Sequence, residues 1–484
     1  MRQQPIEDLV VVVPGITGSR LAVDGKEVWG PSPGALVRGI ASFLGSVKAL
    51  RLPADLGDDH PGDGVVPTGL VPSLHAVPGV RPVVDGYSDL VGWLERGFTL
   101  RRALPTGRPD RPGVPEVPVN LVEFAYDWRL SCRYNARLLA TRVDEALGRW
   151  RATAPQRAGA KVRLICHSMG GLVARYWVER LGGAEVTRQL ITLGTPHRGS
   201  IGALESLVNG HRIGLGPVAA DLTAFSRSLP SLHQLTPDYA CVETPDGLRH
   251  PRELATALDG VDPRLLADAG CFHAEIRQAA LRRVRQGGAE RLCLPVVGVR
   301  QPTPTTAAVT GDGRLRLIET IGGVDEGGDG RVPRFAAYPA EIALDDPVVR
   351  ASFANHGAIK GHAGVREDLY GWLSPTPAVY RGALPAHPLG VRVAEYGAAG
   401  EPLRVEAAAG AEGEGADTLA VRATVRDEHG GTVASRTLRN AGGGRYEGAF
   451  AGLGPGAYAV SVHATLDNAD TAVTALTLVL EGDA

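Results

Sequence analysis

The residues best suited to chemistry surround a serine at the junction of an apolar run and a helix-like pattern. The run at 162–166 leads directly into His-Ser-Met-Gly-Gly at 167–171, and a helical pattern beginning with small residues follows. A tight strand-to-helix turn of this kind exposes a serine hydroxyl above a sheet, and it needs small neighbours. The first position of the Gly-x-Ser-x-Gly pattern is Cys166, which is larger than glycine but still compact. We therefore predict that Ser168 is a nucleophile rather than the cap of an ordinary helix.

Two side chains further along the chain could activate this serine. A serine hydroxyl is a poor nucleophile at neutral pH, so it needs a histidine base that is held in turn by a carboxylate. Asp329 lies in a glycine-rich stretch after the last predicted strand, and His356 follows it in the chain. We predict Asp329 as the acid and His356 as the base. Asp325 is the alternative acid and His362 the alternative base, and Asp329 could instead belong to an Asp-Gly hairpin turn.

A loop near the N-terminus is suited to stabilise developing negative charge. An oxyanion hole needs two backbone N–H donors, and the residue after the nucleophile, Met169, would supply one of them. The stretch 13–20, Val-Pro-Gly-Ile-Thr-Gly-Ser-Arg, follows the first strand-like run, and its glycines let the backbone approach a substrate. We predict the Ile16 amide as the second donor.

The elements that must position these residues alternate between strand-like and helix-like segments. Continuous β-branched or apolar runs indicate strands buried on both faces, and apolar residues at helical spacing indicate the helices between them. The expected strands lie at 9–13, 119–124, 162–166, 189–193 and 294–299, and expected helices lie at 133–151 and 365–373. This alternation predicts an α/β fold with a parallel sheet and right-handed crossovers.

Two long stretches interrupt the alternation. Residues 25–118 are rich in proline and glycine, and residues 198–290 contain several helix-like segments. We interpret both as insertions over one edge of the sheet that form a lid or cap. The segment 104–118 carries five prolines and is expected to be an extended loop.

The composition changes after about residue 375. Short runs of alternating hydrophobicity appear between glycine-rich turns, at 419–425, 432–438, 458–462 and 472–480. We therefore predict a domain boundary near residue 375, with an α/β catalytic domain over 1–375 and an immunoglobulin-like β-sandwich over 376–484. The second domain carries no nucleophile–base pair or metal cluster in its sequence, so we interpret it as an accessory or packing domain.

Composition excludes several classes of protein. The chain has 484 residues, 44% hydrophobic and 21% charged, which is typical of a folded protein of two or more domains. Its 51 basic and 53 acidic side chains give a net charge of −2, which disfavours nucleic-acid binding. No apolar stretch is long enough for a transmembrane helix, and no export signal is visible. The five cysteines have no CxxC pair, so we expect reduced thiols and a cytoplasmic protein.

Together these motifs resemble the lecithin:cholesterol acyltransferase family, within the α/β hydrolases. The matching pieces occur in the family's order over about residues 9–373. They are Val-Val-Val-Pro-Gly-Ile-Thr-Gly-Ser-Arg-Leu at 11–21, Tyr-Asp-Trp-Arg at 126–129, His-Ser-Met-Gly-Gly at 167–171, Thr-Leu-Gly-Thr-Pro-His-Arg-Gly-Ser at 192–200, Gly-Asp-Gly-Arg-Val-Pro at 328–333, and His356. The resemblance implies an α/β-hydrolase fold with Ser168, Asp329 and His356 as the catalytic set and Ile16 with Met169 as oxyanion donors. For Asp127 and Arg129 we favour an ion pair that fixes the loop beneath the site.

The expected activity is cleavage of a lipid or other ester through an acyl-serine, followed by transfer to an alcohol or to water. This chemistry requires neither a metal nor an organic cofactor. We expect at most transient contact with a membrane surface, and the sequence names no protein partner for the C-terminal domain. The alternatives are a catalytically inactive hydrolase-fold scaffold that binds a partner protein, and a serine amidase or peptidase that uses the same three residues.

Overall fold

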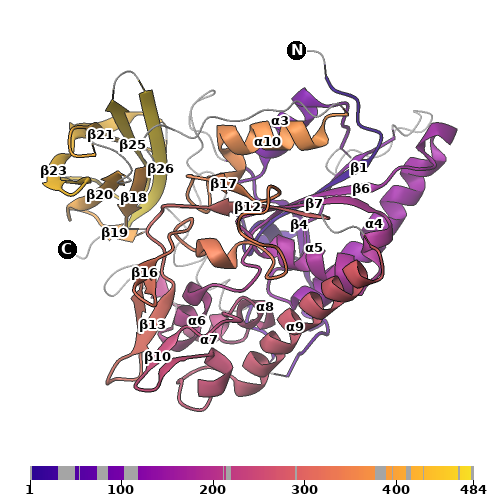
Figure 1. Ribbon diagram of the computed structural model, residues 1–484, viewed down its shortest axis with the longest axis horizontal. Coiled ribbons are helices and arrows are strands. Elements are labelled where there is room, and N and C mark those ends of the chain that lie inside the picture. The colour runs from indigo at the N-terminus through magenta and orange to yellow at the C-terminus, as the bar shows by residue number, and fades with distance from the viewer. Residues whose placement is uncertain are drawn as a thin grey trace.

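The computed structural model describes most of the chain (Figure 1). The described residues are 3–30, 50–53, 55–73, 86–102, 118–210, 212–213, 220–288, 292–375, 389–394, 396–409, 416–428, 430–466 and 469–480. The expected proline-rich loop at 104–118 lies outside them except for its last residue. The expected boundary between the two domains is followed directly by residues 376–388, which also lie outside them.

A six-stranded, fully parallel sheet forms the centre of the first domain, in the order β17-β12-β7-β6-β1-β5. Its strands are β1 (Leu9–Val13), β5 (Leu121–Glu123), β6 (Val162–His167), β7 (Thr187–Leu193), β12 (Cys293–Gly298) and β17 (Arg350–Ser352). The structure contains every strand that the apolar runs predicted. The sequence did not reveal β17, because this three-residue edge strand, Arg-Ala-Ser, has no apolar run.

Helices cover both faces of this sheet, as Figure 1 shows. Helices α4 (Cys132–Ala152) and α5 (Met169–Arg180) pack on one face, and α3 (Ser88–Gly97) and α10 (Ala363–Leu373) pack on the other. Strand β1 explains this arrangement, because Val11 packs into the core under α4 and α5 while Val12 packs into the core under α3 and α10. The continuous valine run is therefore buried from both sides.

The first of the two stretches that interrupt the alternation, residues 25–118, does not only cover one edge of the sheet. It contains β3 (Lys26–Trp29) and β4 (Val65–Leu70), which pair with β2 (Ser19–Val23) in a small antiparallel sheet. It also contains α3, whose Leu90 and Leu94 pack into the core of the main sheet. The α3 segment therefore belongs to the layer that covers the sheet.

The second interrupting stretch forms a largely helical layer beyond α5. Its elements are α6 (Ile201–Val208), β8 (Arg212–Ile213), β9 (Ala220–Asp221), α7 (Thr223–Ser226), α8 (Pro230–Gln234), β10 (Val242–Thr244), β11 (Gly247–Arg249), η4 (Pro251–Leu254) and α9 (Pro263–Arg285). Arg283 near the end of α9 pairs with Glu179 on α5 at 2.8 Å, which fixes the long helix against the domain. Strands β10 and β11 join β13 (Thr306–Val309) and β14 (Leu315–Ile318) in a second small sheet.

Shorter elements complete this domain. They are β15 (Thr320–Ile321), β16 (Val324–Asp325) and the 3-10 helices η1 (Pro155–Arg157), η2 (Gly183–Glu185), η5 (Arg334–Ala336) and η6 (Ile359–Gly361).

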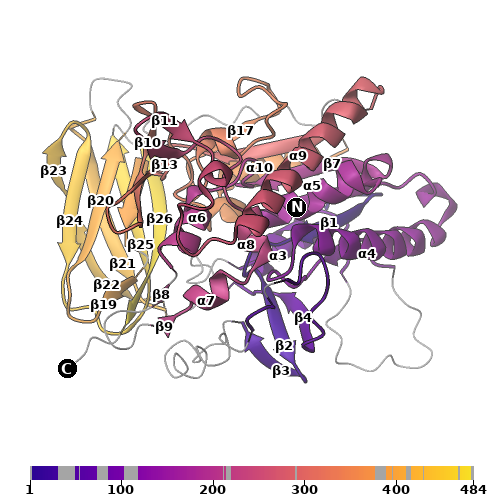
Figure 2. The same cartoon turned by 90° about the horizontal axis from the view of Figure 1, so that it is seen from below.

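In the described part of the chain, two sheets form the C-terminal β-sandwich (Figure 2). One sheet has the order β18-β20-β24-β23 and the other the order β19-β26-β25-β21-β22. The strands are β18 (Leu389–Val393), β19 (Tyr396–Ala398), β20 (Leu403–Ala409), β21 (Ala420–Arg426), β22 (Thr432–Thr437), β23 (Arg439–Gly442), β24 (Arg445–Phe450), β25 (Gly456–Leu466) and β26 (Ala469–Leu480). Alternate residues such as Val405, Val421 and Val460 are fully buried between the sheets, which explains the period of two in the sequence.

Candidate active site

Ser168 lies in the sharp turn between β6 and α5. Its backbone has φ 51° and ψ −128°, a conformation that costs energy for a residue with a side chain. The Ser168 amide donates to the Leu193 carbonyl at 3.0 Å, which ties the turn to the end of β7. A side-chain carbon at Gly170 would lie 2.3 Å from the Pro14 carbonyl oxygen, so this position requires glycine. Cys166, at the position where glycine is more usual, is fully buried in β6 and is accommodated.

His356 and Asp329 lie beside this serine. The His356 Nε2 is 2.9 Å from the Ser168 Oγ, and the His356 Nδ1 is 2.7 Å from the Asp329 Oδ2. A carboxylate only accepts hydrogen bonds, so Nδ1 carries the proton and the lone pair of Nε2 faces the serine hydroxyl. The Asp329 Oδ1 accepts from the amides of Arg331 and Val332, which fixes the carboxylate. The structure therefore brings the three predicted residues together in the order that serine activation requires.

The two alternatives have different surroundings. Asp325 is exposed at the end of β16, and its carboxylate accepts from the Gly327 amide in its own turn. His362 is the N-cap residue of α10. The hydrogen bonds to Ser168 and Asp329 come from His356, so the geometry favours Asp329 and His356 over both alternatives.

The loop expected to hold the second oxyanion donor lies against Ser168. A side-chain carbon at Gly15 would be 2.8 Å from the Ser168 Cβ, and Ile16 follows in the chain. The other expected donor, Met169, begins α5 directly after the serine. Thr17 has a positive φ of 62°, so the loop is sharply bent at this point. Met169 is thus adjacent to Ser168 in the chain, and Ile16 follows a glycine that lies against Ser168.

The Tyr-Asp-Trp-Arg motif at 126–129 supports this loop. The Tyr126 hydroxyl donates to the Pro14 carbonyl at 2.8 Å, and the Trp128 indole donates to the Ser19 carbonyl at 3.3 Å. Arg129 is fully buried and pairs with Asp127 through two guanidinium nitrogens. The favoured interpretation of Asp127 and Arg129 as an ion pair thus agrees with the contacts, and the aromatic residues of the motif hold the loop directly.

His167 forms a buried connection that the sequence reasoning did not single out. Burial, and then the charge of Lys360, lower the pKa of His167 well below its usual value, so its ring is neutral at neutral pH. The His356 carbonyl accepts from Nε2 at 3.0 Å, so Nδ1 accepts from the Tyr87 hydroxyl at 2.8 Å. The Tyr87 oxygen accepts in turn from the Gly15 amide at 2.8 Å. This series of hydrogen bonds links the loop at 13–20 to the backbone of His356, and its members are too far apart in sequence for any spacing to reveal it.

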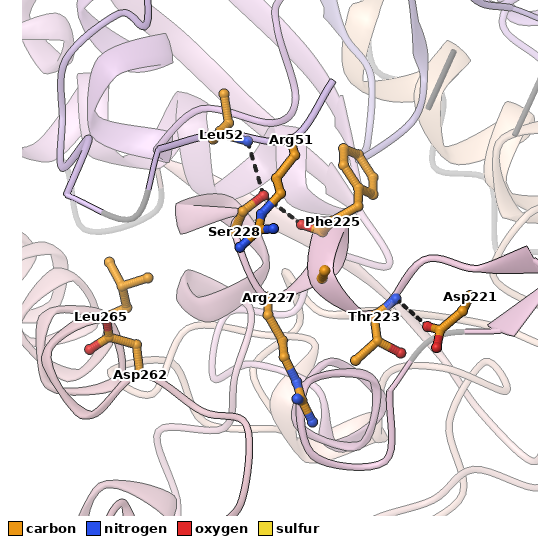
Figure 3. Close-up of a pocket in the computed structure, with 10 residues that line it drawn as sticks. Arg51, Leu52, Asp221, Thr223, Phe225, Arg227, Ser228, Asp262 and Leu265 are labelled. Carbon is orange, nitrogen blue, oxygen red and sulfur yellow. Dashed lines mark hydrogen bonds between the residues drawn. The ribbon is translucent and has the colours of Figure 1, made fainter. Parts of the chain in front are cut away.

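A cavity of about 740 Å³ lies in the layer beyond the sheet (Figure 3). Its walls are Arg51, Leu52, Asp221, Thr223, Ala224, Phe225, Arg227, Ser228, Asp262 and Leu265. The Phe225 ring packs edge-on against Trp128, which packs against Trp29. The Trp29 indole donates to the Thr17 carbonyl at 3.0 Å. Aromatic packing thus connects one wall of this cavity to the loop beside Ser168.

Within the described residues, neither a metal site nor a membrane-spanning helix is found. Their histidine, cysteine and acidic side chains do not cluster in groups of three or more that could hold a metal ion. None of the helices in the described part of the chain is both long enough and apolar enough to cross a bilayer. The five cysteines are all free.

Gly298 gives a direct test of the position of Asp329. A methyl group at this last residue of β12 would lie 2.2 Å from the Asp329 Cβ and 2.8 Å from its Cα. Gly298→Ala should therefore displace the carboxylate and lower kcat for p-nitrophenyl ester cleavage about 100-fold, because a displacement near 1 Å has effects of this size. Gly311→Ala is the matched control, since its added carbon would meet nothing within 4 Å. Parental kcat in Gly298→Ala would contradict the assignment of Asp329.

Comparison with known proteins gives matches to lipases and to one acyltransferase family. The model of the lecithin:cholesterol acyltransferase family matches residues 117–251. A triacylglycerol lipase of Pseudarthrobacter phenanthrenivorans is 32% identical over 160 residues, which cover 31% of this chain and 46% of the lipase. A triacylglycerol lipase of Burkholderia plantarii has the same identity over 31% of this chain and 41% of its own. The chain thus spans less than half the length of the curated relatives it matches.

Among solved structures, the mature Bacillus licheniformis lipase BlEst2 aligns with 77% of this chain and 95% of its own, at 12% identity and a TM-score of 0.35. The α/β-hydrolase fold is evident from this chain's own features, namely the parallel sheet, the helices on both faces and the strand-to-helix turn at Ser168. The resemblance predicted from the sequence is confirmed over residues 117–251, where the chain matches the lecithin:cholesterol acyltransferase family, and two triacylglycerol lipases are similar to about a third of the chain.

Proposed function

We propose that this protein is a serine-dependent O-acyltransferase or lipase that cleaves lipid esters through an acyl-serine intermediate. The observation that carries the proposal is the pair of hydrogen bonds made by His356, at 2.9 Å to Ser168 and 2.7 Å to Asp329. The similarity to triacylglycerol lipases and to the acyltransferase family supports a lipid ester as the substrate.

In the first half of the reaction the Ser168 oxygen attacks the ester carbonyl carbon while its proton passes to the His356 Nε2. Asp329 stabilises the imidazolium that results. The negative charge on the carbonyl oxygen is stabilised by the amides of Met169 and Ile16, each contributing about 3 kcal/mol to lowering the barrier. The imidazolium then protonates the departing alcohol, and the acyl group remains on Ser168.

In the second half an acceptor releases the acyl group. His356 removes a proton from an alcohol or from water, the new oxygen attacks the acyl-serine, and Ser168 regains its proton. Transfer dominates over hydrolysis only when the site excludes water and positions an alcohol, because water is present at a much higher concentration.

Incubation with a mixed lipid extract and a long-chain alcohol tests this function. Mass spectrometry would follow new esters, which report transfer, and free fatty acids, which report hydrolysis. We expect one or both products from the parent protein and neither from Ser168→Ala. The proposal would be contradicted if the parent and Ser168→Ala gave equal amounts of lipid products, or if neither gave any. Turnover of amide substrates alone would indicate a serine amidase. Cytoplasmic localisation and transient contact with a membrane surface stay predictions.

A further inference from the structure

The loops that carry Asp329 and His356 lie on the side of the central sheet that faces the β-sandwich. His356 follows β17, the edge strand, and Figure 1 shows β26 on the side of the sandwich nearest to β17. Strand β18 also approaches closely, because a side-chain carbon at Gly390 would lie 2.6 Å from the Arg300 carbonyl oxygen. The C-terminal domain is thus in direct contact with the segments that position the acid and the base.

Gln301 joins these segments through one buried side chain. It is 1% exposed, and its side-chain nitrogen donates to the Phe353 carbonyl at 2.6 Å and to the Leu389 carbonyl at 3.2 Å. Its side-chain oxygen accepts from the Val391 amide at 3.1 Å. Its backbone amide donates to the carbonyl of Gly328, the residue before Asp329, at 3.1 Å. One residue therefore contacts the acid loop, the base loop and the first strand of the sandwich.

Asn355 makes a second connection directly beside the base. Its side-chain nitrogen donates to the Thr474 carbonyl in β26 at 2.7 Å, and its side-chain oxygen accepts from the Ala358 amide at 3.2 Å. The first bond ties the residue preceding His356 to the sandwich. The second closes the turn from Asn355 to Ala358, which contains His356. The sandwich thus restrains the His356 backbone from one side, while His167 contacts its carbonyl from another.

We propose that the β-sandwich is a positioning domain of the active site. Through Gln301 and Asn355 it holds the loop of His356 where the imidazole can hydrogen-bond to Ser168 and Asp329. The inference rests on the proposed function, and it gives the domain that we interpreted as an accessory or packing domain a role in the reaction. Gln301 and Asn355 are positioning residues, since they act on the reacting groups through the backbone of the two loops. Proton transfer from Ser168 requires His356 within hydrogen-bond reach, so small displacements of this loop should lower the rate of the chemical step.

Asn355→Ser tests this proposal with little disturbance of the fold. Serine can still accept from the Ala358 amide, but it is too short to reach Thr474. Asn440→Ser is the matched control, because Asn440 also donates to a backbone carbonyl, that of Asp417, and accepts from a backbone amide, that of Gly442, but on the exposed surface of the sandwich. Substitution of the buried Gln301 would also lower stability, so the test compares Asn355→Ser with Asn440→Ser.

Two measurements separate positioning from mere stabilisation. With p-nitrophenyl esters we expect Asn355→Ser to lower kcat about 10- to 100-fold with little change in KM, and Asn440→Ser to match the parent. With a fluorophosphonate probe we expect Asn355→Ser to label more slowly by a similar factor but to full stoichiometry. Parental kcat and labelling rate would overturn the inference, as would a reduced labelled fraction at the parental rate, which indicates partial unfolding. A parent protein that neither turns over esters nor reacts with the probe would refute the proposed function itself.

Discussion

Ser168→Ala is expected to abolish ester cleavage, lowering kcat by a factor on the order of 10⁴ or more, because without the hydroxyl no acyl-serine forms. The fold should remain intact, since the substitution removes one oxygen atom from a turn that the Leu193 carbonyl and Gly170 already define. Turnover of p-nitrophenyl esters and phospholipids measures the first effect, and circular dichroism with thermal unfolding measures the second.

Ser435→Ala serves as the control for this experiment. Ser435 lies on β22 at the exposed surface of the sandwich and hydrogen-bonds to Thr424 on the neighbouring strand. We expect its loss to leave turnover unchanged. A folded Ser168→Ala protein that cleaves esters at the parental rate would contradict the assignment of the nucleophile.

Val12→Asp is expected to have the largest effect on stability. Val12 is fully buried in β1, between β5 and β6 in the sheet, and packs into the core under α3 and α10. A carboxylate without a partner in such a site costs about 3–5 kcal/mol, which is a large part of the free energy of unfolding of a typical domain. We expect the variant to be unfolded or to melt at a much lower temperature, as thermal unfolding by circular dichroism would measure.

Val66→Asp makes the same chemical change at an exposed strand position. Val66 lies on β4, and 51% of its surface is exposed, so a charge there remains hydrated. Its melting temperature should stay close to that of the parent. Equal heat resistance of Val12→Asp and the parent would show that β1 is not the buried strand described above.

The sequence predicted those parts of the molecule whose signal is local. The conformations of the valine run in β1 and of the turn at Ser168 are determined by the few residues around them. A local sequence pattern is therefore enough to predict them. The order of Ser168, Asp329 and His356 along the chain then indicated their roles. The sequence also favoured His356 over His362, but only the structure shows which imidazole lies within hydrogen-bonding distance of the serine, namely that of His356.

The features that the sequence did not reveal depend on contacts between distant segments. Tyr87 meets His167 across 80 positions, and Asn355 meets Thr474 across 119. A tyrosine or an asparagine that satisfies a buried backbone group has no characteristic neighbours in sequence, so no motif indicates it. The edge strand β17 was not predicted for a related reason. Its pairing with β12, and not its own composition, determines its conformation.

Reaction with a fluorophosphonate probe, followed by peptide mass spectrometry, shows whether Ser168 is a nucleophile that His356 activates. We expect one equivalent of label on Ser168 in the parent protein, and greatly slowed labelling in His356→Ala, because the 2.9 Å contact between the two side chains activates the hydroxyl. A folded parent protein that remains unlabelled, or that carries the label on another residue, would contradict this expectation.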